Sequence, residues 1–485
     1  MKITFLKQSV NLETIKKDIL AAAIDQETVK QNLQCPVTQK AKELYGFKGD
    51  TEETYIVGGD FGLAAVFGIG SKKSVDNLSA QKLGGRISAH LNGNKIKDAV
   101  IACTKDNAHI VANIAFGIKL HSYRFNKYFV DKKKDKEPTL DNVSLLCDDE
   151  KQAQKIYKEL EKVADNIFFT RNLVSEPSNE LYPAKYAEIC TSLKKEGLHV
   201  EVLGEKQMTK LGMNALLSVG QGSARESQLV VLKYDGASDK KQQPIAFVGK
   251  GVTFDTGGIS IKPAVGMSDM KYDMGGSAVV VGLMRLLAQR KAKVNAVGVI
   301  GLVENMPSGT AYKPGDVIKS MSGQTIEVDN TDAEGRVVLA DALYYTNSKF
   351  NPKFIVDLAT LTGAIVVTLA DVHAGLFSND DKLAKQIEEA GKKTGETVWR
   401  LPVSKEYDEM INSNIADVKN VGNGKGAGSI TAAQFLKRFI GDTAWAHLDI
   451  AGVTWEGKHN PMAVKGATGY GVKLLNQLII DNYEE

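Results

Sequence analysis

The chain has 485 residues, of which 43% are hydrophobic and 25% are charged. Such usage is ordinary for folded globular domains, so the composition excludes a disordered, collagen-like or low-complexity protein. The net charge of +3 is too small to favour nucleic acid or an anionic membrane as the main partner.

The N-terminal part of the chain alternates short apolar runs with helix-like segments, which predicts a small α/β domain. Its opening stretch contains lysines but no apolar core, so it does not resemble a secretory signal. A lysine-rich stretch, Asp131–Glu137, marks the end of this part, and we expect a solvated loop there. The apolar runs are TYIVGG (54–59), AAVFGIG (64–70), DAVIACT (98–104) and NIAFGI (113–118).

From Asp148 to Leu173, apolar residues recur at every third or fourth position among charged ones. This spacing predicts a long amphipathic helix that links two domains. We therefore expect an N-terminal α/β domain at 1–147, a linker helix at 148–173 and a larger C-terminal domain at 174–485.

The C-terminal domain alternates apolar strands with amphipathic helices, which predicts an α/β fold with a mixed, mainly parallel sheet flanked by helices. In such sheets ligands bind just beyond the carboxyl ends of strands. We expect strands at Leu229–Tyr234, Ile245–Gly249 (returning after a polar turn), Val294–Leu302, Thr325–Val328 and Phe354–Leu358, and helices at Gly276–Arg290 and Arg336–Ser348.

The four cysteines stand far apart and form no C-x-x-C pair. This spacing predicts buried free thiols in a reducing compartment rather than a disulfide framework. The longest apolar stretches are far shorter than the ~20 residues of a membrane span. We therefore expect a cytoplasmic protein without a membrane partner.

Three segments are dense in charge: Gly249–Lys262, Met270–Gly276 and Asn330–Arg336. Four carboxylates converging in one cleft could not all stay ionised without cations. Sets of oxygen ligands suit Mg²⁺, Mn²⁺ or Zn²⁺, and four carboxylates are enough for two ions if some of them bridge. The three segments contain the carboxylates Asp255, Asp273, Asp332 and Glu334 and the cations Lys250, Lys262 and Arg336, but no His or Cys.

Each of the three segments also has a purely structural interpretation. Thr331 and Glu334 have the spacing of a capping box ahead of an apolar helix. Asp255 could belong to an ordinary turn, and Asp273 could cap the helix that we expect near Gly276. None of these roles explains why Lys250 directly follows an apolar strand, where burying a charge is costly. The combined pattern therefore favours a site.

The segments 248–278 (VGKGVTFDTGGISIKPAVGMSDMKYDMGGSA) and 304–343, which contains NTDAEGR, closely resemble the leucyl aminopeptidase (cytosol aminopeptidase) family. The resemblance extends through DLATLTGA (357–364), WAHLDIAG (445–452) and GATGYGVKLL (466–475), and covers roughly 172–476. It implies that the larger domain is a catalytic metallopeptidase domain.

The resemblance also implies two metal ions per subunit, Mn²⁺ or Zn²⁺. Asp255 and Glu334 would bridge the ions, Asp332 would complete one ligand set, and Lys250 with Asp273 would complete the other. Because an ammonium group cannot bind a metal, Lys250 would have to be neutral. Of the two remaining cations, Lys262 would polarise the scissile carbonyl, and Arg336 would hold a bicarbonate ion that acts as general base towards the bridging water.

The activity implied by the resemblance is release of N-terminal amino acids from peptides with a free N-terminus. Leu and other apolar residues would be preferred, with broad specificity, because a missing methylene changes discrimination by only ~1–3 kcal/mol. The family further implies a homohexamer. The residues implied to line the pocket for the first side chain are Met270, Thr360, Leu361, Gly363 and Ala451.

Other classes of function have less support. An aspartic protease needs two Asp-Thr-Gly loops, and the chain has one; no G-x-S-x-G occurs for a serine hydrolase. The glycine-rich stretch Gly422–Ser429 does not satisfy the phosphate-binding pattern, so we expect a flexible loop. His373 and His447 are expected in the core or behind the site. DNA binding, a second role of some family members, has only weak support from the small positive charge and the lysine-rich loop.

Overall fold

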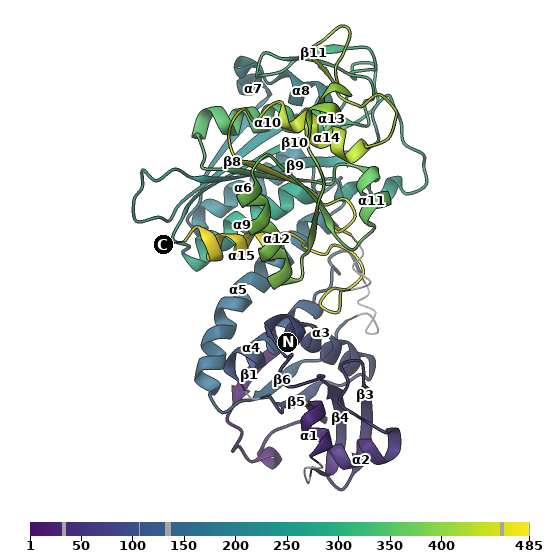
Figure 1. Ribbon diagram of the computed structural model, residues 1–485, viewed down its shortest axis with the longest axis vertical. Coiled ribbons are helices and arrows are strands. Elements are labelled where there is room, and N and C mark those ends of the chain that lie inside the picture. Colours follow the sequence, from purple (N-terminus) through teal and green to yellow (C-terminus); the bar gives the residue numbers. More distant parts are fainter. Residues whose placement is uncertain (32–34, 106, 131–136, 456–459, 485) are drawn as a thin grey trace. The chain divides into compact units, whose positions relative to one another are not determined.

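The computed structural model describes residues 1–31, 35–105, 107–130, 137–455 and 460–484 (Figure 1). These residues form two compact units, the first from 1–165 and 460–464 and the second from 166–455 and 465–484. The lysine-rich loop predicted at 131–137 lies, except for Glu137, outside the described residues.

The first unit is built on a six-stranded sheet in the order β1-β6-β5-β2-β4-β3. All neighbouring strands are parallel except β3 and β4, which form an antiparallel hairpin. The predicted small α/β domain is therefore confirmed. Its elements are β1 (Lys2–Leu6), η1 (Leu12–Thr14), β2 (Ile19–Ile24), α1 (Gln26–Lys30), α2 (Pro36–Tyr45), β3 (Thr54–Gly59), β4 (Gly62–Gly68), α3 (Asn77–Gly93), β5 (Asp98–Cys103), α4 (Ala108–His121) and β6 (Asn142–Leu146).

One apolar run of this unit is not a strand. The residues 113–118 (NIAFGI) lie inside α4, which is buried on nearly all sides. A short apolar run does not distinguish a strand from a fully buried helix. The helix packs closely on α3, because a Cβ atom added at Gly117 or at Gly84 would overlap the backbone of the other helix.

The long helix predicted between the domains is present as α5 (Glu150–Ser175). It begins in the first unit and ends in the second. The domain limits at 147 and 173 stay a prediction. Among the described helices, none combines the length and apolar character needed to cross a membrane.

The second unit is built on an eight-stranded sheet in the order β15-β14-β17-β13-β9-β10-β8-β7. The central strands β17, β13, β9 and β10 are parallel to one another, and the outer strands include antiparallel pairs. The predicted mixed sheet is confirmed. Its strands are β7 (His199–Gly204), β8 (Gln228–Asp235), β9 (Ile245–Asp255), β10 (Asn295–Asn305), β13 (Ile355–Ala359), β14 (Ala374–Ser378), β15 (Val398–Arg400) and β17 (Trp445–Asp449).

The strand β9 does return antiparallel to β8, but β10 lies between them. Ten of the eleven residues of β10 are buried, so this strand is stable only with a neighbour on each side and a helix layer on each face. A polar turn between two strands does not by itself make them neighbours.

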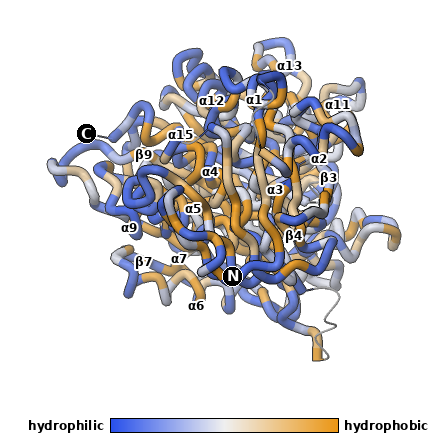
Figure 2. The backbone as a smooth tube through the Cα atoms, turned by 90° about the horizontal axis from the view of Figure 1, so that it is seen from below, coloured by the Kyte–Doolittle hydropathy of each residue, from blue (hydrophilic) through white to orange (hydrophobic). Residues whose placement is uncertain are grey.

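Helices cover both faces of this sheet, with α8, α10 and α14 on one face and α9, α12 and α15 on the other (Figure 1). Hydrophobic stretches of the chain run along the interior strands and helices, and hydrophilic stretches form outer turns (Figure 2). The remaining bounds are α6 (Pro183–Ser192), η3 (Leu193–Glu196), α7 (Glu205–Leu211), α8 (Asn214–Gly220), η4 (Met267–Tyr272), α9 (Gly275–Arg290), α10 (Glu334–Phe350), α11 (Gly363–Leu369), α12 (Asp381–Thr394), α13 (Lys405–Glu409), α14 (Gly428–Lys437) and α15 (Val472–Asn482).

A separate three-stranded sheet consists of β11 (Val317–Lys319), β12 (Thr325–Glu327) and β16 (Val418–Lys419). The predicted strand Thr325–Val328 is therefore β12 and does not belong to the main sheet. The NTDAEGR loop leaves this small sheet and enters α10. The loop therefore does not extend from a strand of the main sheet.

Among the described residues, none of the four cysteines forms a disulfide, as the sequence predicts. Cys103, Cys147 and Cys190 are buried, and Cys35 is half-buried.

We predict that Gly276→Ala lowers the free energy of unfolding by about 2 kcal/mol, because overpacking a core costs ~1–3 kcal/mol. A Cβ atom at this position would overlap the carbonyl oxygen of Leu358, where α9 crosses β13. The clash outweighs the gain of up to ~1 kcal/mol in helix propensity. Urea unfolding measures the change. Gly309→Ala is the control, since no atom lies within 4 Å of the added Cβ, and equal stability of both variants would contradict the prediction.

Candidate metal centre

Three carboxylates meet at one point of the second unit. Asp255 ends β9, Asp273 lies between η4 and α9, and Glu334 begins α10. One carboxylate oxygen of each residue lies within 4.8 Å of the others, and all three side chains are buried. The sequence therefore predicted this convergence correctly, although only Asp255 lies at the end of a strand of the main sheet.

Lys250 neutralises part of this cluster. Its Nζ atom lies 2.7 Å from Asp273 Oδ1 and 2.8 Å from Glu334 Oε1, and it donates to the carbonyl oxygen of Thr360 at 2.9 Å. Burial alone would lower the pKa of the ammonium group, but the surrounding carboxylates raise it above its ordinary value. In the metal-free chain Lys250 is thus a charged ammonium group. The resemblance implies the neutral form only for a site that holds metal ions.

Lys250 does not follow the strand, as the sequence suggested, but lies in the middle of β9. The strand continues to Asp255 because its backbone stays paired with β10 as far as Asn305. The side chain is only 3% exposed. A lysine within a buried strand requires carboxylate partners, which supports the functional interpretation of the cluster.

Lys262 occupies the other side of the cluster. Its Nζ atom lies 2.7 Å from Asp255 Oδ2 and also contacts Asp332 Oδ1. Asp332 is more exposed than the three buried carboxylates. Burial alone would lower the pKa of Lys262, but the charges of Asp255 and Glu334 outweigh this effect and raise the pKa above its ordinary value. The ammonium group is therefore charged. Lys262 therefore brings Asp332 next to the buried three.

The cluster carries more negative charge than its two lysines compensate. Burial raises the pKa of Asp273 well above its ordinary value, and the Lys250 ammonium offsets only part of this rise. Burial followed by the Glu334 charge also raises the pKa of Asp255. Within the described part of the chain, no hydrogen-bond donor reaches Asp273 Oδ2. A buried acceptor without a donor, in a set of carboxylates, fits a divalent cation.

The structural alternatives for these acids are wrong in two cases. Ala333 precedes α10 as its N-cap, and the Thr331 hydroxyl donates to Gly257 O at 2.6 Å instead of capping the helix. Met274 precedes α9, and Asp273 accepts from Thr360 Oγ1 at 2.7 Å. Neither Glu334 nor Asp273 caps a helix, and both carboxylates belong to the cluster.

The turn interpretation of Asp255 is confirmed, because Asp255 Oδ1 accepts from the backbone N–H of Gly257 at 2.9 Å. The following glycines make the turn possible, since Gly257 and Gly258 have φ angles of 86° and 66°. The turn and the cluster are therefore compatible uses of one carboxylate.

Sequence reasoning missed the side chains that fix the acidic loops. Asn305 Nδ2 donates to Asp255 Oδ1 at 2.8 Å and to Thr331 O at 3.1 Å. Tyr312 donates to the same Thr331 carbonyl at 2.8 Å. The available signal was a polar residue at the end of an apolar strand, which Asn305 shares with Asp255.

Arg336 lies two residues beyond Glu334 on α10 and is 7% exposed. Its Nη1 donates to Asn420 O at 2.8 Å, and its Nε has no hydrogen-bond partner among the described residues. Burial lowers its pKa to about 10, although Glu334 and Asp449 act against this shift. Arg336 is thus a buried cation that could accept a small anion.

The residues expected to line a side-chain pocket come from three loops. Thr360 and Leu361 follow β13, Gly363 begins α11, and Ala451 follows β17. The backbone N–H groups of Leu361 and Ala451 both donate to Asp449 Oδ1, at 3.1 and 3.3 Å. Asp449 thereby connects two of these loops, and the Leu361 N–H is already engaged. Met270 lies in η4, half-buried, three residues before Asp273.

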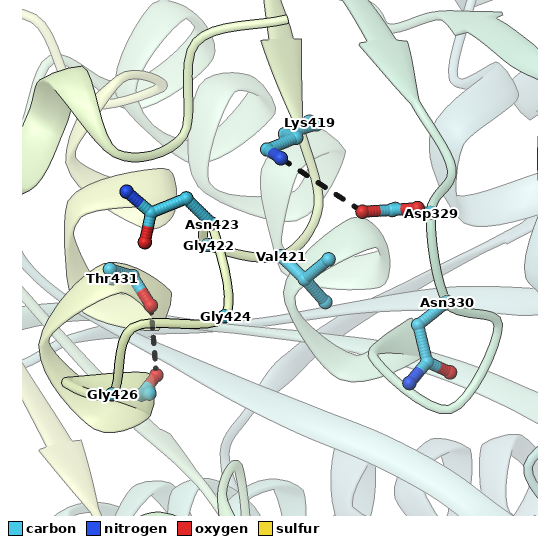
Figure 3. Close-up of a pocket in the computed structure, with 10 residues that line it drawn as sticks. Asp329, Asn330, Lys419, Val421, Gly422, Asn423, Gly424, Gly426 and Thr431 are labelled. Carbon is cyan, nitrogen blue, oxygen red and sulfur yellow. Dashed lines mark hydrogen bonds and ion pairs between the residues drawn. The ribbon is translucent and has the colours of Figure 1, made fainter.

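A cavity of about 730 Å³ opens beside the NTDAEGR loop (Figure 3). Asp329 and Asn330 line one side, and the glycine-rich loop lines the other. As predicted, 422–427 form a loop between β16 and α14, with φ angles of 78° at Gly424 and 94° at Gly426.

Among the described residues, neither histidine belongs to the group of side chains that could hold a metal ion. His447 is fully buried, with Nδ1 2.6 Å from Asp357 Oδ1, and is a core residue as predicted. His373 is half-buried and contacts Thr397 Oγ1 at 2.8 Å.

An α/β fold with buried carboxylates and a buried lysine at one point defines a metal-dependent hydrolase. Comparisons with known proteins narrow this class. The family model described as the cytosol aminopeptidase catalytic domain matches residues 168–476, and the model of that family's N-terminal domain matches residues 16–132. The chain belongs to the cytosol aminopeptidase family.

Relatives cover most of the chain. A probable cytosol aminopeptidase of Caulobacter vibrioides is 58% identical over 379 residues, which are 78% of this chain and 77% of the relative. One from Brucella anthropi is 50% identical over 459 residues, covering 92% and 91%. Among solved structures, a mutant of tomato leucine aminopeptidase has a TM-score of 0.87 at 30% identity, covering 99% of this chain and 97% of that chain. The bottromycin maturation enzyme BotP in complex with Mn has a TM-score of 0.84 at 28% identity, covering 96% and 99%.

We predict that Lys250→Met lowers the free energy of unfolding of the metal-stripped protein by about 3–5 kcal/mol, because it leaves buried carboxylates without a counter-charge. Removing the ammonium group raises the pKa of Asp273 further in the folded state. Stability is then lost as the pH rises, so the deficit is larger at about pH 8 than at about pH 5.

Urea unfolding in the presence of a chelator measures this deficit. Lys313→Met is the matched control, since Lys313 is 67% exposed and pairs only with Asp316 on the surface. Its loss should stay below about 1 kcal/mol. A deficit for Lys250→Met that is equally small, or that does not change with pH, would refute the assignment of a charged Lys250.

Proposed function

We propose that this chain is a metal-dependent aminopeptidase that releases N-terminal amino acids from peptides with a free N-terminus. Leu and other apolar residues are the preferred first residues, with broad specificity. The observation that carries the proposal is the buried meeting of Asp255, Asp273 and Glu334 around Lys250, in a chain 58% identical to a probable cytosol aminopeptidase.

The metal site takes two divalent ions, Mn²⁺ or Zn²⁺. Asp255, Asp273, Asp332, Glu334 and Lys250 would hold these ions. The donor-free Asp273 Oδ2 and the excess of carboxylates support this assignment. When bound, two such ions lower the pKa of a shared water and act as Lewis acids on the substrate.

The two remaining cations act on the substrate side. Lys262 stays protonated because Asp255 and Asp332 contact its Nζ atom, so it can donate a hydrogen bond to the oxygen of the scissile carbonyl. Arg336 binds a bicarbonate ion, and this ion acts as the general base. Its buried charge and its unpaired Nε support this role.

The first side chain of the substrate lies among Met270, Thr360, Leu361, Gly363 and Ala451. A free α-amino group is required because it would bind a metal ion, and acylation delocalises its lone pair into the amide carbonyl. We further propose that the enzyme assembles as a homohexamer and acts on cytosolic peptides. These last two statements rest on family membership, and native mass measurement tests the first of them.

The proposed activity is tested with leucine amide and its N-acetyl form. We expect hydrolysis of the first compound and none of the second, because only a free amine can complete the metal-bound complex. Metal-stripped protein should be inactive and should recover when Mn²⁺ or Zn²⁺ is restored. Equal rates on both compounds, or activity that survives the chelator, would rule out a metal-dependent aminopeptidase.

Substitution tests the individual roles. Glu334→Ala and Lys262→Ala should each lower kcat by at least ~10²–10³, the usual loss when a group that stabilises developing charge is removed. The controls are Glu389→Ala and Lys382→Ala on α12, which change the same residue types at exposed positions. Rates of metal-loaded protein give the comparison. Turnover of either site variant close to the control would remove that residue from the mechanism.

A further inference from the structure

Asn420 is a fully buried side chain between β16 and the glycine-rich loop. Both ends of its amide are used. The Oδ1 atom accepts from the backbone N–H of Asp329 at 2.8 Å and of Asn330 at 3.3 Å. The Nδ2 group donates to the carbonyl oxygens of Asn330 at 2.7 Å and Ala333 at 3.4 Å. One side chain therefore satisfies four backbone contacts within a five-residue loop.

This loop carries Asp332 and leads directly into Glu334, the first residue of α10. Asp332 lies between the backbone groups that Asn420 contacts, and Glu334 follows directly. The Asp332 N–H donates to Asn330 Oδ1 at 2.8 Å, which makes the loop compact. Because the loop is not paired with any strand, these side-chain contacts take the place of a sheet ladder.

Asn420 also contacts the third functional residue of this segment. Its backbone carbonyl accepts from Arg336 Nη1 at 2.8 Å. One edge of the guanidinium group is thereby fixed, and Nε is left without a partner among the described residues. Asn420 thus contacts the loop of Asp332 and the side chain of Arg336 at the same time.

The position of Asn420 in the small sheet explains how it is fixed in turn. The pairing of β12 with β16 ends at Glu327 and Lys419, and the Asn420 N–H extends it by donating to Glu327 O at 3.0 Å. Beyond this point the two chain segments separate and line opposite sides of the cavity (Figure 3). Asn420 therefore connects the two segments at the point where their backbone pairing ends.

We propose that Asn420 is a positioning residue, which sets the backbone at 329–333 so that Asp332 and Glu334 reach the acidic cluster and so that Arg336 keeps its orientation. The inference rests on the proposed function. It predicts that loss of the Asn420 side chain weakens metal binding and turnover together, because outer partners of metal ligands commonly contribute 10–100-fold to affinity or rate.

The test compares Mn²⁺ binding and catalysis in Asn420→Ala and Asn420→Asp. Asn420→Asp keeps the shape and the acceptor but turns an anion towards two carbonyl oxygens, so it should fold and still fail. We expect titration calorimetry of the metal-stripped variants to show Mn²⁺ binding weakened by about 10–100-fold. At saturating Mn²⁺, kcat on leucine amide should fall, and KM should stay within about threefold because uniform substrate binding is unaffected.

Asn295→Ala is the matched control. Asn295 is also buried in the same unit, as the first residue of β10. Its side chain accepts from Ala237 N at 3.2 Å and donates to Asp239 O and Gln242 O, both at 3.1 Å. It should lose stability without a change in Mn²⁺ binding. Wild-type Mn²⁺ affinity and kcat in both Asn420 variants would overturn the proposal. Equal loss of Mn²⁺ binding in Asn295→Ala would also overturn it, since the effect would then be general destabilisation. If the wild type does not hydrolyse leucine amide, the proposed activity fails, while the Mn²⁺ titration still decides the role of Asn420.

Discussion

Burial of three carboxylates within 4.8 Å of one another is the constraint on which the rest of the structure depends. Because water cannot solvate these buried carboxylates, nearby positive charge must stabilise them. Lys250 and Lys262 supply part of it, and the pKa of Asp273 still rises well above its ordinary value. A folded state that lacks enough positive charge around its buried carboxylates favours the binding of divalent ions, because each ion supplies part of the missing charge.

Such a cluster persists only if the backbone cannot relax away from it. Asp255 is held by the pairing of β9 with β10 and by Asn305, and Asp273 is held by the hydroxyl of Thr360. The segment before Glu334 has no strand partner and depends on side chains, chiefly Thr331 and Asn420. Neutral hydrogen-bonding groups therefore hold the carboxylates close together, and they add no further charge to the site.

The sequence predicted the α/β class, the long helix and six charged residues that meet in the second unit. The seventh, Arg336, donates to the carbonyl oxygen of Asn420. It did not predict their supports. Thr331 has the spacing of a capping residue, yet its hydroxyl bonds to Gly257. Local spacing describes what a residue can do within one turn of helix, and contacts across seventy residues of sequence have no local pattern. For the same reason the apolar run in α4 was mistaken for a strand, since burial on all sides removes the periodicity that separates the two.

By itself, the sequence determined which residues carry charge, where apolar runs alternate with polar turns, and to which family the motifs point, because these follow from residue types and their spacing. Only the tertiary structure decided that β10 lies between β8 and β9, that Lys250 is inside a strand, and that Asn420 and Asp449 connect the loops around the site. Those outcomes depend on which distant backbone groups remain to be satisfied once the core is packed, and packing is settled by the whole chain at once.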